Sequence, residues 1–176
     1  EFVDGTVLSE VLKSGPLPVA LAIDYACQAL AGISHIHSYQ VVHRDIKPAN
    51  LHQGEDGKLR ILDLGVALNT NSSIAASTGN PGTPSFMAPE LFAGETANMQ
   101  SDLYATGVTL YHLLTRHYPY GEIEPFQRPR FGDPVPPTRY RPDIPQWLEN
   151  IILKILSSTK FRFVSTHKTN DRFKRC

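Results

Sequence analysis

His43-Arg44-Asp45-Ile46-Lys47-Pro48-Ala49-Asn50 is the most informative stretch of this sequence. It places a carboxylate and an amide oxygen five residues apart, with an ammonium group between them. On one loop, Asp45 could orient a hydroxyl nucleophile or accept its proton, and Asn50 could coordinate a hard cation such as Mg²⁺. Lys47 could hold a phosphate oxygen as a point charge. These groups are the ones that phosphoryl transfer needs from a protein.

Three further blocks follow in order along the chain. Asp63-Leu64-Gly65 comes directly after the short strand predicted at 59–62, so Asp63 is expected at the end of a strand, well placed to face a ligand. Its carboxylate could give a metal ion a second oxygen ligand beside Asn50. The other two blocks are residues 82–90 and Asp102-Leu103-Tyr104.

Taken in this order, the blocks resemble the catalytic half of a protein kinase. Residues 43–50 match H-R-D-L-x-x-x-N with Ile46 in place of Leu. Residues 63–65 match D-F-G with Leu64 in place of Phe, and residues 88–90 are A-P-E. A single match would be weak, but all of them in the right order make the resemblance specific.

The resemblance covers residues 1 to about 156 and leaves 157–176 as a divergent basic tail. Lys47 and the position of Thr83 ahead of A-P-E resemble the serine/threonine form of the family. The resemblance implies that the chain folds as the C-terminal lobe of such a kinase, which is mainly α with a few short β-strands, in the α+β class. The Pro-rich stretch before Trp147 is most similar to bacterial members, some of which are joined to a metal-dependent phosphatase module.

The resemblance implies transfer of the ATP γ-phosphate to a Ser or Thr hydroxyl of a protein substrate. Asp45 is similar to the catalytic base, and Lys47 is similar to the contact with the transferring phosphate. Asn50 and Asp63 are similar to the Mg²⁺ ligands, so ATP and Mg²⁺ are the implied cofactors.

Two further positions are implied to lie near the adenine base. Val3, together with Phe2, is similar to the hinge whose backbone reads adenine. His52 stands where the family usually has an apolar residue that lines the adenine pocket. It therefore predicts a looser or shifted adenine fit.

Residues 63–90 are similar to an activation segment, and the Asn, Ser, Thr, Gly and Pro content of residues 67–85 predicts a long mobile loop. Arg44 is of the type that pairs with a phosphate on that segment. Asp102 is similar to the buried acid that anchors the catalytic loop. Glu90 usually pairs with a later Arg, but Arg162 comes one residue too early, so its partner is left open. The candidate phosphate acceptors are Thr70, Ser72, Ser73, Ser77 and Thr78, with Ser77 and Thr78 favoured.

The sequence contains no G-x-G-x-x-G loop and no strand Lys of the V-A-I-K type. Because a kinase binds ATP between two lobes, we expect this chain alone, without the N-terminal lobe, to phosphorylate poorly or not at all. The main alternative is a non-catalytic, pseudokinase-like scaffold that binds partners. The intact catalytic positions argue against it, and the missing lobe argues for it. A small-molecule kinase is a weaker alternative, because residues 82–90 in this family shape a peptide site.

Hydrophobic periodicity predicts helices from Pro18 to about Ser38, after an N-cap at Ser101, and from about Gln146 to Leu156. A short strand that runs into a turn is predicted at 1–5, and two more strands are predicted around a turn at 54–57. Most prolines lie in 116–145, which is predicted to be irregular. The expected buried stripes are Leu103, Gly107, Leu110, Leu113 and Leu114 in the second helix, and Leu148, Ile151, Ile152, Ile155 and Leu156 in the third.

The chain has zero formal net charge, 41% hydrophobic and 19% charged residues, which predicts a buried core. Of its 17 Lys+Arg and 17 Asp+Glu, residues 157–176 carry 6 and 1. We expect no nucleic-acid partner, although such a tail could attract nucleic acid or an anionic membrane. No apolar run approaches the roughly 20 residues that span a bilayer, so no membrane segment is expected.

Cysteine and histidine usage points to no metal site. Cys27 and Cys176 lack metal-ligand spacing, and free thiols fit a cytoplasmic location. His43 is expected to pack beneath the catalytic loop rather than to carry a proton. The remaining histidines expected to be structural or on the surface are His35, His37, His112, His117 and His167.

Overall fold

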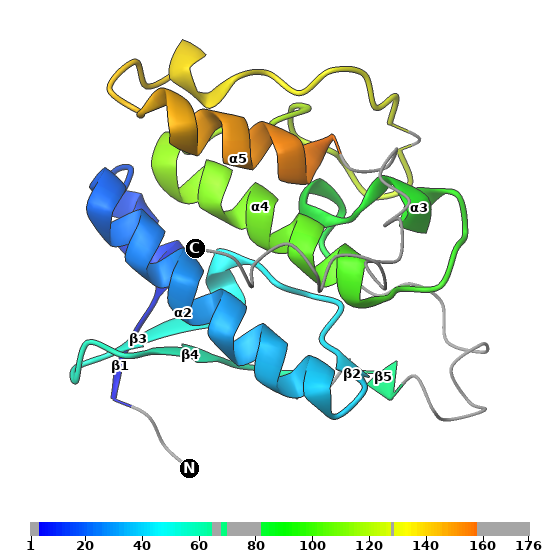
Figure 1. The fold of residues 1–176 in the computed structure, drawn as a ribbon, viewed down its shortest axis with the longest axis horizontal. Coiled ribbons are helices and arrows are strands. Elements are labelled where there is room, and N and C mark those ends of the chain that lie inside the picture. Colours follow the sequence, from blue (N-terminus) through cyan, green and yellow to red (C-terminus); the bar gives the residue numbers. More distant parts are fainter. Residues whose placement is uncertain (1–3, 65–67, 70–81, 128, 158–176) are drawn as a thin grey trace, which may run out of the picture.

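The computed structural model describes residues 4–64, 68–69, 82–127 and 129–157 (Figure 1). Three long helices form its larger part: α2 (Val19–Ser38), α4 (Met99–Thr115) and α5 (Gln146–Leu156). A small sheet of β1, β3 and β4 lies at one edge, beneath α2 in Figure 1. The fold is therefore mainly helical with a few short strands, and this expectation from the sequence is confirmed.

Helix α2 begins after Pro18 and ends at Ser38, as the sequence predicts. Its buried residues are Ala22, Tyr25, Ala26, Ala29 and Ile33, and they face α4 and the sheet. By length and composition alone, this helix is apolar enough to cross a membrane, so the expectation that no apolar run approaches that length was wrong. The buried face of this helix packs against α4.

Helix α4 is the buried central helix, with most of its residues shielded from solvent. Its N-cap is Asn98 and not Ser101 as predicted. The Asn98 Oδ1 accepts hydrogen bonds from Gln100 N (2.8 Å) and Ser101 N (3.2 Å). Ser101 Oγ accepts from Asn98 N at 3.2 Å, so the two residues form a reciprocal capping box. Leu103, expected in the buried stripe, is 38% exposed.

Helix α5 packs along α4, and Gly107 makes the close approach possible. A Cβ on Gly107 would lie 2.5 Å from Ile155 Cγ2, which is inside van der Waals contact. Leu148, Ile152 and Leu156 are buried as predicted, but Ile151 is 47% exposed and does not belong to the buried face.

The sheet order is β1 (Gly5–Val7), β3 (Leu51–Gly54) and β4 (Leu59–Ile61), all antiparallel, with Gly5 opposite Gly54 and Leu51 opposite Ile61. Among the described residues the first strand thus begins at Gly5, where the sequence predicted a turn. Gly5 has φ 139°, and a Cβ there would lie 2.1 Å from Gln53 O. Only glycine allows the two backbones to approach this closely.

A second, two-stranded sheet pairs β2 (Val41–Val42) with β5 (Leu68–Asn69). Strand β5 falls inside residues 67–85, where the sequence predicted only a loop. It therefore connects the start of the predicted activation segment to the residues that lead into the catalytic loop.

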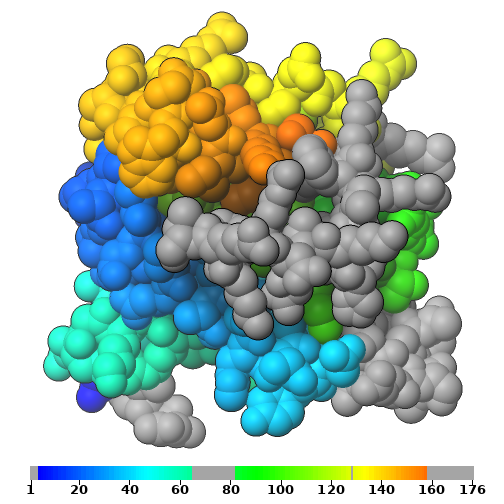
Figure 2. Space-filling view, in the orientation of Figure 1, coloured from blue at the N-terminus to red at the C-terminus, as the bar shows by residue number. Residues whose placement is uncertain are grey.

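The remaining elements are short. They are α1 (Leu8–Val11), α3 (Pro89–Phe92) and 3₁₀ turns at Leu12–Ser14, Pro48–Asn50, Pro84–Phe86 and Pro137–Arg139. The Pro-rich segment between α4 and α5 is otherwise irregular, as predicted, and in Figure 2 it lies beside α5 at one edge of the molecule. Tyr120 Oη donates to Leu156 O of α5 at 3.0 Å, and Arg141 donates to Leu17 O in the loop before α2, so both residues fix this segment to the rest of the domain.

Candidate active site

Asp102, in the first turn of α4, holds the catalytic loop in place from below. Its Oδ2 accepts a hydrogen bond from His43 N and its Oδ1 accepts one from Arg44 N, both at 2.9 Å. The carboxylate is 1% exposed, and its Oδ2 also lies 2.8 Å from His37 Nε2. Arg44 has a left-handed backbone, with φ 73°, which is costly for a residue with a Cβ. The hydrogen bond from Arg44 N to Asp102 helps to compensate for that cost.

His43 lies fully buried beneath the loop, as predicted. Its Nδ1 accepts from Asp45 N at 3.3 Å, so the proton of a neutral ring belongs on Nε2, which donates to Leu62 O at 2.9 Å. The imidazole therefore uses both nitrogens for structure. It joins the loop that carries Asp45 to the strand end that precedes Asp63.

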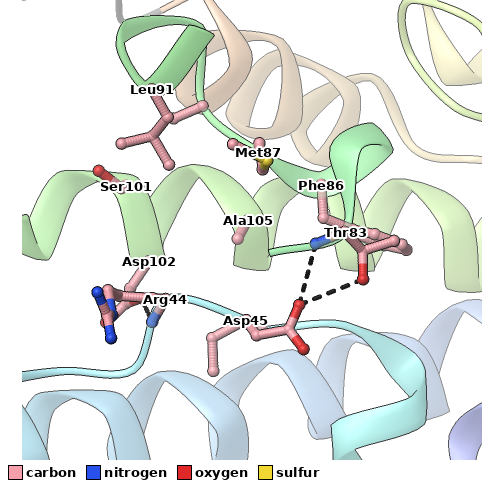
Figure 3. Close-up of a pocket in the computed structure, with 11 residues that line it drawn as sticks. Arg44, Asp45, Thr83, Phe86, Met87, Leu91, Ser101, Asp102 and Ala105 are labelled. Carbon is pink, nitrogen blue, oxygen red and sulfur yellow. Dashed lines mark hydrogen bonds between the residues drawn. The ribbon is translucent and has the colours of Figure 1, made fainter. Parts of the chain in front are cut away.

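Three residues converge on the carboxylate of Asp45 (Figure 3 shows the Thr83 side). Its Oδ2 accepts from Lys47 Nζ at 2.7 Å and from Asn50 Nδ2 at 2.9 Å. Its Oδ1 accepts from both N and Oγ1 of Thr83, each at 3.2 Å. Lys47 Nζ also donates to Thr83 Oγ1 at 2.7 Å, which closes the cluster. The structure thus brings together three predicted catalytic residues, Asp45, Lys47 and Asn50.

Thr83 is the partner that the sequence did not predict for this cluster. The residue was identified only as part of the block that precedes A-P-E. It lies 38 positions from Asp45, and only the fold shows that its hydroxyl meets the carboxylate. Figure 3 also shows that the Arg44 and Asp45 side chains, although adjacent in sequence, point in different directions.

The backbone brings the two predicted metal ligands, Asn50 and Asp63, near each other. Asn50 is nearly buried and uses Nδ2 to donate to Asp45 O (2.7 Å) and Oδ2, which leaves Oδ1 on the opposite branch of the amide. Leu62 N donates to Asn50 O at 2.8 Å, so Asp63 follows directly after this contact. Asp63 is exposed and has φ 62°.

One amide oxygen and one carboxylate form a set of hard donors that fits Mg²⁺, which keeps several of its waters in such sites. In the described part of the chain no cluster of three or more His, Cys, Asp or Glu side chains forms another metal site.

Of the two residues predicted to lie near adenine, only His52 belongs to the described part of the chain. Val3 lies outside the described residues. His52 lies in β3 opposite Val7 and is 7% exposed, with its Cε1 2.7 Å from where a Gly5 Cβ would be. Its Nδ1 is buried and has no hydrogen-bond partner among the described residues.

The described part of the predicted activation segment contacts α4. Glu90 Oε1 accepts from Ser101 Oγ at 3.3 Å, which gives Glu90 a partner within the described chain. Burial lowers the pKa of the Arg44 guanidinium, although the nearby Asp102 opposes this shift. Arg44, Asp102 and Ser101 line a small cavity with Met87 and Leu91 of the segment (Figure 3). The five candidate phosphate acceptors and Arg162 lie outside the described residues.

The sequence matches the protein kinase domain family over residues 1–162. It is 32% identical over 165 residues to the serine/threonine-protein kinase PknB of Mycolicibacterium smegmatis, covering 89% of this chain and 26% of that protein. It is 34% identical over 171 residues to the serine/threonine-protein kinase PrkC of Bacillus subtilis, covering 94% of this chain and 26% of that protein.

Rhodopsin kinase GRK1 of Rattus norvegicus is 41% identical over 103 residues, which cover 58% of this chain and 18% of that protein. The chain therefore spans about a quarter of the length of the bacterial relatives it matches. Since the family match extends over most of the chain, and the bacterial relatives are aligned over nearly all of it, the chain belongs to the protein kinase family, in its bacterial-like serine/threonine branch.

Proposed function

We propose that this chain is the catalytic, C-terminal lobe of a protein serine/threonine kinase that transfers the γ-phosphate of ATP to a Ser or Thr hydroxyl of a protein substrate. The observation that carries the proposal is the convergence of Lys47, Asn50 and Thr83 on the Asp45 carboxylate. A structural ion pair alone would not require an amide and a hydroxyl to point at the same two oxygens.

In this proposal Asp45 orients the acceptor hydroxyl and takes its proton as the phosphoryl group is transferred. The bonds from Thr83 to Asp45 Oδ1 are long, at 3.2 Å, so a substrate hydroxyl can compete for that oxygen. Lys47 places its positive charge beside the transferring phosphate. Asn50 and Asp63 would hold Mg²⁺, which supplies charge neutralisation at the phosphates when bound.

The proposal has two further parts. First, the 176 residues alone transfer phosphate poorly or not at all, because they include neither a Gly-rich loop nor a strand Lys. Second, the lobe works in the cytoplasm, next to an N-terminal lobe and, in the manner of some bacterial kinases, a fused phosphatase module. The non-catalytic scaffold is the alternative, and it differs in predicting no transfer even when the N-terminal lobe is supplied.

The test is to join this chain to the N-terminal lobe of a serine/threonine kinase that carries both missing parts, and to measure transfer of labelled phosphate to a general protein substrate. We expect transfer in this two-lobed protein, and a decrease of about 10²–10⁴-fold with Asp45→Asn. The matched control is Asp133→Asn, an exposed carboxylate of the Pro-rich segment, which should leave the rate unchanged.

Two results would contradict the proposal. A folded two-lobed protein without transfer would favour the scaffold. Transfer that persists in the Asp45→Asn variant would show that Asp45 is not the base.

A further inference from the structure

An open groove with a volume of about 470 Å³ begins beside the Asp45 cluster and runs towards the C-terminal end of α4. Lys47 and Thr83, which both contact the Asp45 carboxylate, line one end of it. We call it the basic groove and define it by the residues that matter here: Lys13, Lys47, Thr83, His112, Arg116 and Tyr118. Because it adjoins the catalytic carboxylate, a substrate bound there would place neighbouring side chains in the groove.

The residues that line the basic groove carry an excess of positive charge. Among the described residues that line it there are three permanent cations, Lys13, Lys47 and Arg116, and no Asp or Glu. Two nearby carboxylates are paired at its edge: Glu10 with Lys13 and Asp45 with Lys47, each at 2.7 Å.

Not all of this positive charge is committed to those pairs. The Lys13–Glu10 pair is exposed on both sides (72% and 52%), so it is worth little and Lys13 can change partner. Arg116 is exposed at the end of α4. It has no salt bridge within 4.0 Å among the described residues.

The floor of the groove is aromatic rather than charged. His112 and Tyr118 stack with ring centroids 4.5 Å apart and an angle of 11°, and Phe86 packs edge-on against both. Burial lowers the pKa of His112, and the positive charge of Arg116 adds to this effect, while Glu122 and a hydrogen bond with His117 O oppose it. The groove therefore has a neutral floor with cations at its rim.

We propose that the basic groove binds an anionic side chain, a carboxylate or a phosphate, that lies within a few residues of the Ser or Thr acceptor. This inference rests on the proposed function, because it takes Asp45 as the point where the acceptor hydroxyl binds. Arg116 and Lys13 are specificity-determining residues in this proposal. They contact the substrate away from the reacting atoms and are not part of the transfer step.

The test measures binding by fluorescence anisotropy, with the 176-residue chain and labelled Ser peptides in which Asp, phosphoserine, Ala or Lys replaces each neighbouring position in turn. We expect Asp or phosphoserine to bind about tenfold more tightly than Lys at one or two positions, the scale of two partly screened ion pairs. The preference should weaken as salt is added. Tighter binding of phosphoserine than Asp would identify phosphorylated segments as the source of the anion, and equal binding would identify acidic ones.

Charge reversal provides the decisive variants. Lys13→Glu and Arg116→Glu, alone and together, should remove the preference for Asp and create one for Lys. Lys58→Glu, at the exposed turn between β3 and β4, is the matched control and should change nothing. Far-UV circular dichroism and melting temperatures check that each variant is folded, and the single variants serve if the double variant is not.

Equal affinities for acidic and basic peptides, no binding of any acidic peptide, or a preference that survives both reversals would overturn the inference. These outcomes leave the Asp45-dependent transfer by the two-lobed protein untouched. Loss of that transfer with an intact acidic preference would count against the proposed function alone.

Discussion

At the scale of single residues, the loop that carries Asp45 is held by the buried carboxylate of Asp102. Asp102 accepts two backbone hydrogen bonds from the loop and lies 2.8 Å from His37. Its effect is to fix a left-handed Arg44 so that the next residue, Asp45, faces Thr83. A buried acceptor of this kind helps to set the direction of the Asp45 side chain.

We expect Asp102→Ala to lower the free energy of unfolding by about 3 kcal/mol, because the buried N–H of His43 and the partly buried N–H of Arg44 would lose their acceptor. Urea unfolding followed by far-UV circular dichroism measures it. Asp102→Asn, which keeps one oxygen, should cost less, and the exposed Asp24→Ala in α2 should cost little. A variant Asp102→Ala that is as stable as Asp24→Ala would show that the loop is held by other contacts.

The sequence predicted the residues of the local motif well, but it did not predict which distant residues contact them. The roles proposed for Asp45, Lys47 and Asn50 follow from a local motif, and the fold brings these residues together. The contact of Thr83 with Asp45, and that of His37 with Asp102, join positions 38 and 65 residues apart. No local pattern encodes such contacts, and His37 was expected only to be a structural or surface residue.

At the scale of elements, the spacing of apolar residues predicted the three long helices well. The errors lie at helix ends and stripe edges. Ser is a common N-cap residue, but the N-cap here is Asn98, one turn before Ser101. Ser101 is its reciprocal partner in the capping box. Strand β5 could not be predicted, because its two residues pair only with β2, which precedes the catalytic loop.

The close packing of α4 against α5 decides whether Gly107→Ala stabilises or destabilises the protein. Ala is normally favoured over Gly in a helix by about 1 kcal/mol. In Gly107→Ala, however, the new Cβ would lie 2.5 Å from Ile155 Cγ2, a short, stiff branch. We expect a net loss of about 1–3 kcal/mol in urea unfolding, typical of overpacking.

Gly32→Ala in α2 is the matched control for this prediction. Its Cβ would lie 2.9 Å from Ile61 Cδ1, the far end of a flexible side chain that can move away. This variant should be neutral or slightly stabilising. In addition, Gly107→Ala should cost less in an Ile155→Ala background. If both glycine variants behave alike, the close approach of α4 and α5 does not control stability.

At the scale of the whole molecule, the proposed function assigns this chain one side of a nucleotide site. Asn50 and Asp63 offer oxygen ligands, and His52 lies on the adjoining strand, whereas the sequence has no Gly-rich loop to cover the phosphates. Magnesium should therefore control whatever nucleotide binding remains. Without it, the phosphates would meet the carboxylate of Asp63 with no ion between them.

We accordingly expect ATP to raise the melting temperature of the 176-residue chain only when Mg²⁺ is present. At a nucleotide concentration equal to the Kd, linkage supplies about 0.4 kcal/mol. For a domain of this size that is about 1–2 °C. Asp63→Ala should abolish the rise and Asp133→Ala should retain it, because Asp133 is an equally exposed carboxylate in the Pro-rich segment. A rise that does not need Mg²⁺, or that survives Asp63→Ala, would mean that the nucleotide binds through groups other than Asp63 and its metal ion.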